Sequence, residues 1–78
     1  MRPEEVVARV FSIAVGDVND NTSTKTISNW DSYGHIALIV ELESAYRVAL
    51  SPEDTLAMAD VASIKRVLRS YGATWSSM

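Results

Sequence analysis

The stretch Trp30-Asp31-Ser32-Tyr33-Gly34-His35-Ile36 decides how the chain is interpreted, because it joins a polar segment to an apolar helix. Asp31 or Ser32 can cap that helix, since a side-chain oxygen at a helix start accepts from the free amide hydrogens of the first turn. The positive end of the helix dipole also favours an acidic residue there. The residues that follow predict a helix as far as about Arg47. The sequence therefore places a serine hydroxyl at the start of an apolar helix, directly after an aspartate.

The predicted helix has two distinct faces when each residue is advanced by about 100°. The core face is expected to hold Leu38, Ile39, Leu42, Ala45 and Tyr46, with His35 at its edge. A second face holds Ser32, Ile36, Val40 and Glu43, with Tyr33 nearby. An apolar stripe with an acidic rim is a candidate docking surface on a small domain. The alternative is that a short third helix or the first loop buries Ile36 and Val40, and the sequence leaves both interpretations open.

Residues before this stretch predict a first helix followed by a long polar loop. Arg2-Pro3-Glu4-Glu5 is a helix start, since proline is tolerated in the first turn and glutamates suit the dipole. Gly16 is the expected end of this helix. The apolar residues at helical spacing are Val6, Val7, Val10, Phe11 and Ile13. A loop over residues 16–31 is long for a compact domain, so it needs apolar anchors. The candidate anchors are Val18, Ile27 and Trp30.

The loop contains a partial match to a calcium-binding pattern. Asp17, Asn19 and Asn21 occupy its first, third and fifth positions. Thr22 and Ser28, however, stand where the pattern requires glycine and a bidentate glutamate. We therefore interpret the segment as a turn in which Asn and Asp side chains bond to their own backbone, and we expect no metal site.

Residues after the central helix predict two further helices. Ser51-Pro52-Glu53-Asp54 is a start signal for a short helix, and Asp60 can cap a last helix from Val61 to about Tyr71. Gly72 is the expected end of that helix. Its inner stripe is Val61, Ile64, Val67, Leu68 and Tyr71, and Lys65, Arg66 and Arg69 are expected to face water. Residues 73–78 are expected to form a disordered tail with Trp75 exposed.

Length and composition limit the classes of protein. The 78 residues are expected to form one domain, residues 1–78, and periodicity predicts an all-α small helical bundle. A net charge of −3 argues against nucleic-acid binding, because phosphate contacts require a basic face. There is no cysteine, which excludes a disulfide framework and a thiolate zinc site. No apolar run is long enough for a membrane span, and a cytoplasmic monomer is expected.

The central stretch resembles the attachment site of the acyl carrier protein family, which places an Asp-Ser pair at the start of its second helix. The matching residues are Asp31 and Ser32, followed by Gly34-His35-Ile36 and Leu38-Ile39-Val40-Glu41-Leu42-Glu43. The resemblance extends from Val6 to Tyr71 and implies a four-helix bundle with three longer helices, one short helix and a long first loop. Tyr33 stands where the family usually has leucine, and Gly34 and Ala37 stand where acids are common.

The resemblance implies that Ser32 carries a covalent 4′-phosphopantetheine arm, added from coenzyme A by a phosphopantetheinyl transferase that recognises Asp31. The arm would hold acyl intermediates as thioesters for acyl-loading and acyl-accepting enzymes of fatty-acid-like, polyketide or other specialised pathways. The expected docking residues are, in order, Ile36, Val40, Glu43, then Tyr33 and Glu41. An aminoacyl or peptidyl carrier of a nonribosomal pathway is a related alternative. An unmodified helical adaptor is an alternative from another class.

A serine hydrolase is the other chemistry that this stretch suggests, since Ser32 and His35 are three residues apart on a helix. A serine nucleophile needs a base, a third group that orients the base, and an oxyanion site. Asp31 is badly placed to orient His35, and no glycine-rich strand-turn-helix surrounds the serine. We therefore expect no enzyme activity and interpret His35 as a boundary residue with a satisfied ring nitrogen. Gly34 is interpreted as leaving space beside Ser32 while weakening the first turn.

Overall fold

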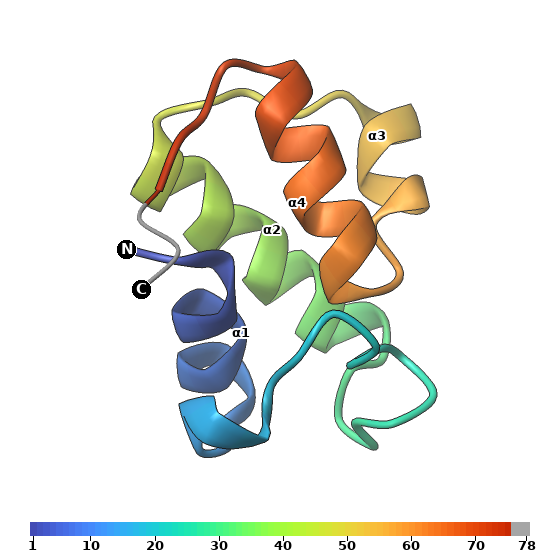
Figure 1. Ribbon diagram of the computed structural model, residues 1–78. Helices are drawn as coiled ribbons and strands as arrows, with labels where there is room; N and C mark the ends of the chain where they lie inside the picture. The colour runs from blue at the N-terminus through green and yellow to red at the C-terminus, as the bar shows by residue number, and fades with distance from the viewer. Residues whose placement is uncertain (76–78) are drawn as a thin grey trace.

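Four α-helices make up most of residues 1–75, the part of the chain that this computed structural model describes (Figure 1). They are α1 (Pro3–Phe11), α2 (Ser32–Tyr46), α3 (Pro52–Ala57) and α4 (Val61–Ser70), with a short 3-10 helix, η1 (Val15–Asp17), after α1. No β-strand occurs in the described residues. The predicted small helical bundle, with three longer helices, one short helix and a long first loop, is confirmed.

Three helices begin at the polar residues that the sequence indicates. The Asp31 carboxylate accepts from the Gly34 amide at 2.9 Å at the start of α2. Ser51 Oγ accepts from the Asp54 amide at 3.2 Å at the start of α3. Asp60 does the same for α4, where the Ser63 amide donates to its Oδ1 at 2.7 Å. Each cap satisfies one amide hydrogen that has no partner within its own helix.

The predicted end of α1 at Gly16 is wrong. The helix ends at Phe11, because Ser12 takes a left-handed conformation with φ 56° and the Ile13 amide bonds back to the Ala8 carbonyl at 3.0 Å. This reversal satisfies a free carbonyl at the helix end without a glycine. Gly72, with φ 84°, ends α4 as predicted.

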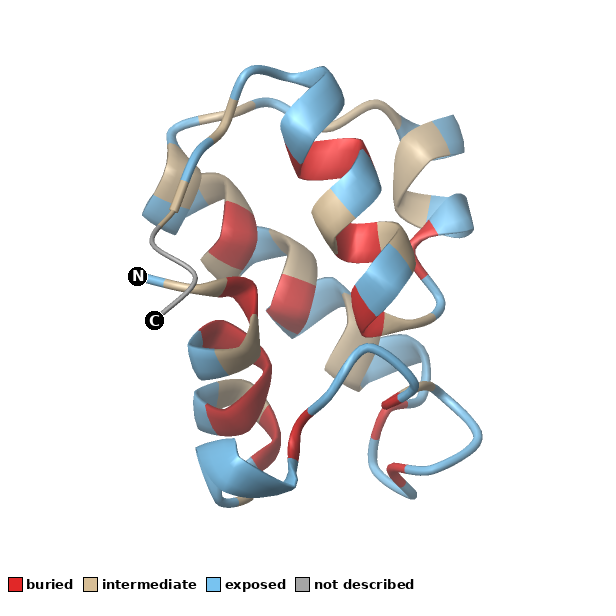
Figure 2. Cartoon of the chain, viewed as in Figure 1, coloured by how far each residue is buried: buried red, intermediate tan, exposed pale blue. Residues whose placement is uncertain are grey.

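The core lies between α1, α2 and α4 and is completed by the first loop (Figure 2). Its buried apolar residues are Val6, Val7, Ala8, Phe11, Val18, Ile27, Trp30, Leu38, Leu42, Met58, Val61, Ile64, Val67 and Leu68. The three loop residues that the sequence indicates as anchors, Val18, Ile27 and Trp30, are all buried. The loop is long because it supplies part of the core.

One predicted core residue of α2, Ala45, is exposed. Leu38, Leu42 and Tyr46 rotate progressively along the helix, by about 40° for each step of four residues. The buried direction is therefore centred near Leu42, and Ala45 falls at the edge of that face, where a methyl group is too short to reach the core.

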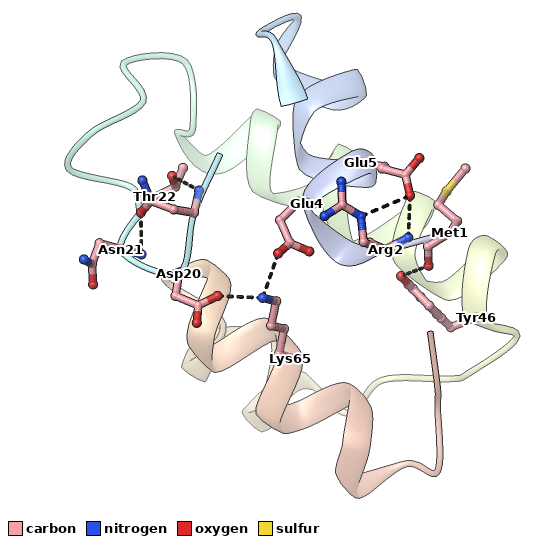
Figure 3. Close-up of polar contacts among 10 residues, drawn as sticks. Met1, Arg2, Glu4, Glu5, Asp20, Asn21, Thr22, Tyr46 and Lys65 are labelled. Atoms are coloured by element: carbon pink, nitrogen blue, oxygen red, sulfur yellow. Dashed lines mark hydrogen bonds and ion pairs between the residues drawn. The ribbon is translucent and has the colours of Figure 1, made fainter. Parts of the chain in front are cut away.

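The expectation that Lys65 faces water is also wrong. Its ammonium lies 2.7 Å from Glu4 Oε2 of α1 and 2.6 Å from Asp20 Oδ1 of the first loop, and its side chain is only 16% exposed (Figure 3). Burial raises the pKa of the Glu4 carboxyl, but the hydrogen bond and positive charge of Lys65 outweigh burial and hold that pKa below its ordinary value. The same contacts raise the pKa of Lys65, through the hydrogen bond to Asp20 and then the one to Glu4.

Backbone bonds attach the loop to the start of α4 as well. The Val61 amide donates to the Thr22 carbonyl at 3.0 Å, and the Thr24 amide donates to the Ala59 carbonyl at 3.1 Å. An isolated antiparallel bridge joins Ser23 to Asp60 at the same place. The middle of the first loop is therefore fixed to the start of α4.

The structure describes residues 73–75 of the tail that the sequence predicts to be disordered, and residues 76–78 lie outside the described part of the chain. Trp75 is half-buried and meets the Tyr46 ring edge-on, with ring centroids 5.9 Å apart. The Arg69 guanidinium lies 4.8 Å from the centre of the indole, a cation–π contact. An aromatic ring and a cation hold Trp75 over the C-terminal end of α2, so the prediction that Trp75 is exposed is wrong.

Candidate functional site

Ser32 is the first residue of α2, and its side chain is exposed. The cap of this helix is Asp31, so the serine hydroxyl is not the group that satisfies the first turn. Within residues 1–75 no hydrogen bond engages that hydroxyl. The structure therefore separates two roles that the sequence leaves combined: Asp31 caps the helix, and Ser32 presents a hydroxyl to solvent.

Two aromatic rings lie beside the start of α2. The Trp30 indole is buried and stacks on Phe11 of α1, with centroids 5.2 Å apart. Its Nε1 donates to His35 Nδ1 at 2.9 Å, and His35 Nε2 lies 2.7 Å from the Thr55 carbonyl oxygen of α3. The satisfied ring nitrogen that the sequence predicts for His35 is confirmed, and the second nitrogen is engaged as well. The histidine is therefore not a free base for Ser32, which argues against a Ser-His nucleophile.

Gly34 packs closely on the rest of the protein. A Cβ at this position would lie 2.3 Å from the Asn29 carbonyl oxygen and 2.8 Å from Phe11 Cε1. The absence of a side chain therefore lets α2 approach the first loop and α1, and the space it leaves is not beside Ser32 as interpreted from the sequence. This close approach fixes the position of the turn that carries the serine.

Exposed apolar side chains occur on α2 after Ser32 and on α3. Tyr33 is 86% exposed, Ile36 62% and Val40 56%, so the alternative in which α3 or the first loop buries Ile36 and Val40 is wrong. Leu56 of α3 is 82% exposed and is not among the docking residues expected from the sequence. We call Tyr33, Ile36, Val40 and Leu56 the apolar surface. Single exposed apolar residues are common, but four of them on two adjacent helices are a candidate contact area.

The two glutamates expected beside this surface make contacts within the protein. Glu43 Oε2 accepts from the Leu50 amide at 2.9 Å and so holds the link that follows α2. Glu41 Oε2 forms an ion pair with Arg9 of α1 at 3.1 Å. An open groove of about 420 Å³ lies beside this pair, lined by Arg9, Val10, Ala37, Val40 and Glu41. The apolar residues are thus freer for a partner than the acidic ones.

The residues of the partial calcium pattern line one open pocket of the first loop. The Asn19 side-chain oxygen accepts from the Asn21 amide at 2.8 Å, which is the local turn that the sequence indicates. Within residues 1–75 no group of three or more His, Cys, Asp or Glu side chains is placed to hold a metal ion. Nor does any helix there have the length and apolar character needed to cross a membrane.

Comparison with known proteins adds no family to this description. None of the protein-family models matches the sequence, and no curated protein matches it.

Proposed function

We propose that the protein is an acyl carrier protein in which Ser32 bears a covalent 4′-phosphopantetheine arm. The observation that supports this most directly is the exposed hydroxyl of Ser32 at the first position of α2, which bonds to no other described residue, with Asp31 supplying the cap. The four-helix arrangement and the long first loop agree with the resemblance of residues 31–43 to the attachment site of that family.

The surroundings of the hydroxyl suit the attachment of a phosphate. Ser32 is exposed and nothing in the described chain bonds to it, so a phosphodiester can be accommodated without unfolding. The first-turn amide hydrogens and the dipole of α2 favour negative charge there. Asp31 opposes the phosphate electrostatically, so we assign its carboxylate, beyond capping, to recognition by the phosphopantetheinyl transferase.

The arm, when attached, supplies a thiol that carries acyl groups as thioesters. The protein's own residues then have two tasks, to present the serine and to be recognised by successive enzymes. Repeated docking and release requires weak contacts. The apolar surface is small and its neighbouring glutamates are engaged within the protein, which suits such contacts. We propose Ile36, Val40 and Tyr33 as docking residues, together with Leu56, and we give Glu43 and Glu41 a lesser part.

A helical adaptor without modification is the second candidate, since the exposed Ile36, Val40 and Leu56 could bind one protein partner directly. The two functions differ in their need for the Ser32 hydroxyl. A carrier requires it, whereas an adaptor would bind its partner equally well without it.

Intact-mass spectrometry after incubation with coenzyme A and a broad-specificity phosphopantetheinyl transferase separates these functions. We expect the wild type to gain the mass of one phosphopantetheine and Ser32→Ala to gain none. Ser44→Ala is the matched control, because Ser44 is also an exposed serine of α2, and it should be modified normally. No gain in the wild type, or an equal gain in Ser32→Ala, would refute the proposal.

Asp31→Asn tests the second role of the aspartate. Asparagine caps helices about as well as aspartate, so the free energy of unfolding should change little. The rate of modification should fall, because the negative charge proposed for transferase recognition is lost. An unchanged rate would confine Asp31 to its role as a cap.

A further inference from the structure

The imidazole of His35 joins the two segments that flank the start of α2. One neighbour is Trp30, at the end of the first loop, and the other is Thr55, in α3. Trp30 precedes Ser32 by two residues, and His35 follows it by three, which is about one helical turn. We call Trp30, His35 and Thr55 the histidine clasp.

The partners determine the protonation state of the ring. An indole N–H can only donate, so His35 Nδ1, which lies 2.9 Å from Trp30 Nε1, must accept and carry no proton. A backbone carbonyl can only accept, so Nε2, which lies 2.7 Å from the Thr55 oxygen, must carry the proton and donate. Only the neutral ring with its proton on Nε2 makes both bonds.

Protonation breaks one side of the clasp and keeps the other. The imidazolium carries a proton on Nδ1 as well, so two N–H groups would face one another where Trp30 now donates. The bond to Thr55 would remain, since Nε2 still donates. On acidification the first loop therefore loses its bond to the ring, whereas α3 keeps its own.

The elements that contact the ring carry carboxylates close in sequence to its two partners. Asp31, at the start of α2, is held by the Gly34 amide. Glu53 and Asp54 precede Thr55 on α3, and Asp54 is bonded to Ser51 and to the Tyr71 hydroxyl. The remaining neighbour is apolar, since Trp30 is packed on Phe11 of α1. No carboxylate in the described chain replaces the lost bond between Trp30 and His35.

We propose that His35 is a pH-sensitive positioning residue for Ser32: its neutral ring holds the first loop and α3 on either side of the serine, and protonation releases the loop. The effect on modification rests on the proposed function, whereas the release itself is a property of the unmodified protein and can be measured without a transferase.

The release is tested by NMR of the unmodified protein as the pH is lowered from about 8 to about 5. The indole N–H resonance of Trp30, assigned with Trp75→Phe, should change as the His35 ring gains its proton in the same sample. The Trp75 indole is the internal control and should not follow. The proposal is overturned if the His35 ring gains its proton while the Trp30 resonance stays constant, or if the ring gains no proton over this range.

Two substitutions of His35 each keep one of the two hydrogen bonds of the histidine clasp and remove the other. His35→Asn places an amide oxygen near the position of Nδ1, so it can accept from Trp30 and does not titrate. His35→Gln places an amide nitrogen near the position of Nε2, so it can keep Thr55 and not Trp30. We expect the Trp30 resonance to be independent of pH in both variants, near its neutral wild-type position in His35→Asn and near its acidic position in His35→Gln. The reverse order would overturn the assignment of the two nitrogens.

The positioning role is tested by the rate of phosphopantetheine transfer at about pH 7.5 and about pH 5.5, expressed as the ratio of wild type to His35→Asn. The ratio cancels the pH response of the transferase itself. This ratio should fall about fivefold on acidification, which corresponds to the free energy of one hydrogen bond between neutral groups. A constant ratio would overturn the positioning role. If no protein gains mass at either pH, the proposed function fails, and the Trp30 resonance still decides whether the clasp opens.

Discussion

Replacing Gly34 by alanine separates the packing of this glycine from its intrinsic helix propensity. Alanine is better than glycine inside a helix by about 1 kcal/mol, so propensity alone predicts a more stable protein. The structure predicts the opposite, because the added Cβ would lie 2.3 Å from the Asn29 carbonyl oxygen and 2.8 Å from Phe11 Cε1. The first contact is with backbone, which cannot move aside as a flexible side chain can.

The magnitude follows from these two opposing effects. Overpacking of a well-filled site costs about 1–3 kcal/mol, and a backbone contact at this distance belongs at the upper end. Subtracting the gain in propensity leaves a net loss of about 2 kcal/mol in the free energy of unfolding. For a domain of this size that corresponds to a fall in Tm of about 10 °C.

Urea unfolding followed by circular dichroism, with a thermal scan on the same samples, measures this loss. Gly16→Ala is the matched control, since a Cβ there would meet nothing within 4 Å, and it should leave stability unchanged within about 0.5 kcal/mol. A Gly34→Ala protein more stable than wild type would show that α2 does not approach the loop closely, and the reasoning would be refuted.

Three further predictions concern the charged and polar contacts. Lys65→Met should lower the free energy of unfolding by about 2 kcal/mol in urea, because Glu4 would keep a largely buried charge without its ammonium partner; an unchanged value would mean that the cluster contributes nothing. The pKa of Glu4 is lowered, so the stability that the Glu4 carboxylate contributes is fully present above its ordinary pKa of 4.5 and is lost as the pH falls through the lowered value. Acid unfolding curves of Lys65→Met should lack this loss of stability. Burial raises the pKa of Tyr46 to about 12, with the charges of Glu4 and a neighbouring glutamate adding to the effect. The stability that the neutral Tyr46 hydroxyl contributes is therefore fully present below its ordinary pKa of 10.0 and is lost as the pH rises through about 12. Allowing for solvent screening, this contribution is about 1 kcal/mol. In thermal scans, Tyr46→Phe should lose less stability at alkaline pH than the wild type. Asp31→Ala should cost about 1 kcal/mol as the loss of a helix cap, and equal stability of the two proteins would contradict that role.

Features that depend on neighbouring residues in the chain could be predicted from the sequence. The caps at Asp31, Ser51 and Asp60 are examples, because a cap and its amide are only three residues apart. The end of α4 at Gly72 is another, since the left-handed conformation there favours glycine. Local chemistry was thus sufficient to identify the helix starts and the serine that begins α2.

Features that depend on tertiary contacts could not be predicted in this way. The spacing of Lys65 on α4 places it beside Arg66 and Arg69, and only the arrival of Glu4 and Asp20 from distant segments makes it partly buried. Gly34 likewise has no local sign of its contact with Asn29 and Phe11. Two of these distant contacts, those of Lys65 and those of Gly34, determine how the first loop is held against the helices.

The partners of His35 show the same limit within the candidate site. A satisfied boundary histidine could be expected from its place on the helix, but Thr55 lies twenty residues away and could not be identified. Leu56 was missed for a related reason, because a six-residue helix has too few turns for its apolar pattern to show which side faces the core.

The contacts of Tyr46 have a practical consequence for immobilising or fusing the protein. Its hydroxyl donates to the Met1 carbonyl at 2.7 Å, and its ring meets Trp75, so residues 1 and 75 both lie at the C-terminal end of α2. Ser32 begins the same helix, about 20 Å away at 1.5 Å per residue. A bead, a purification tag or a fluorescent reporter joined beyond either position would therefore attach near the other end of α2 and leave the hydroxyl within reach of large enzymes.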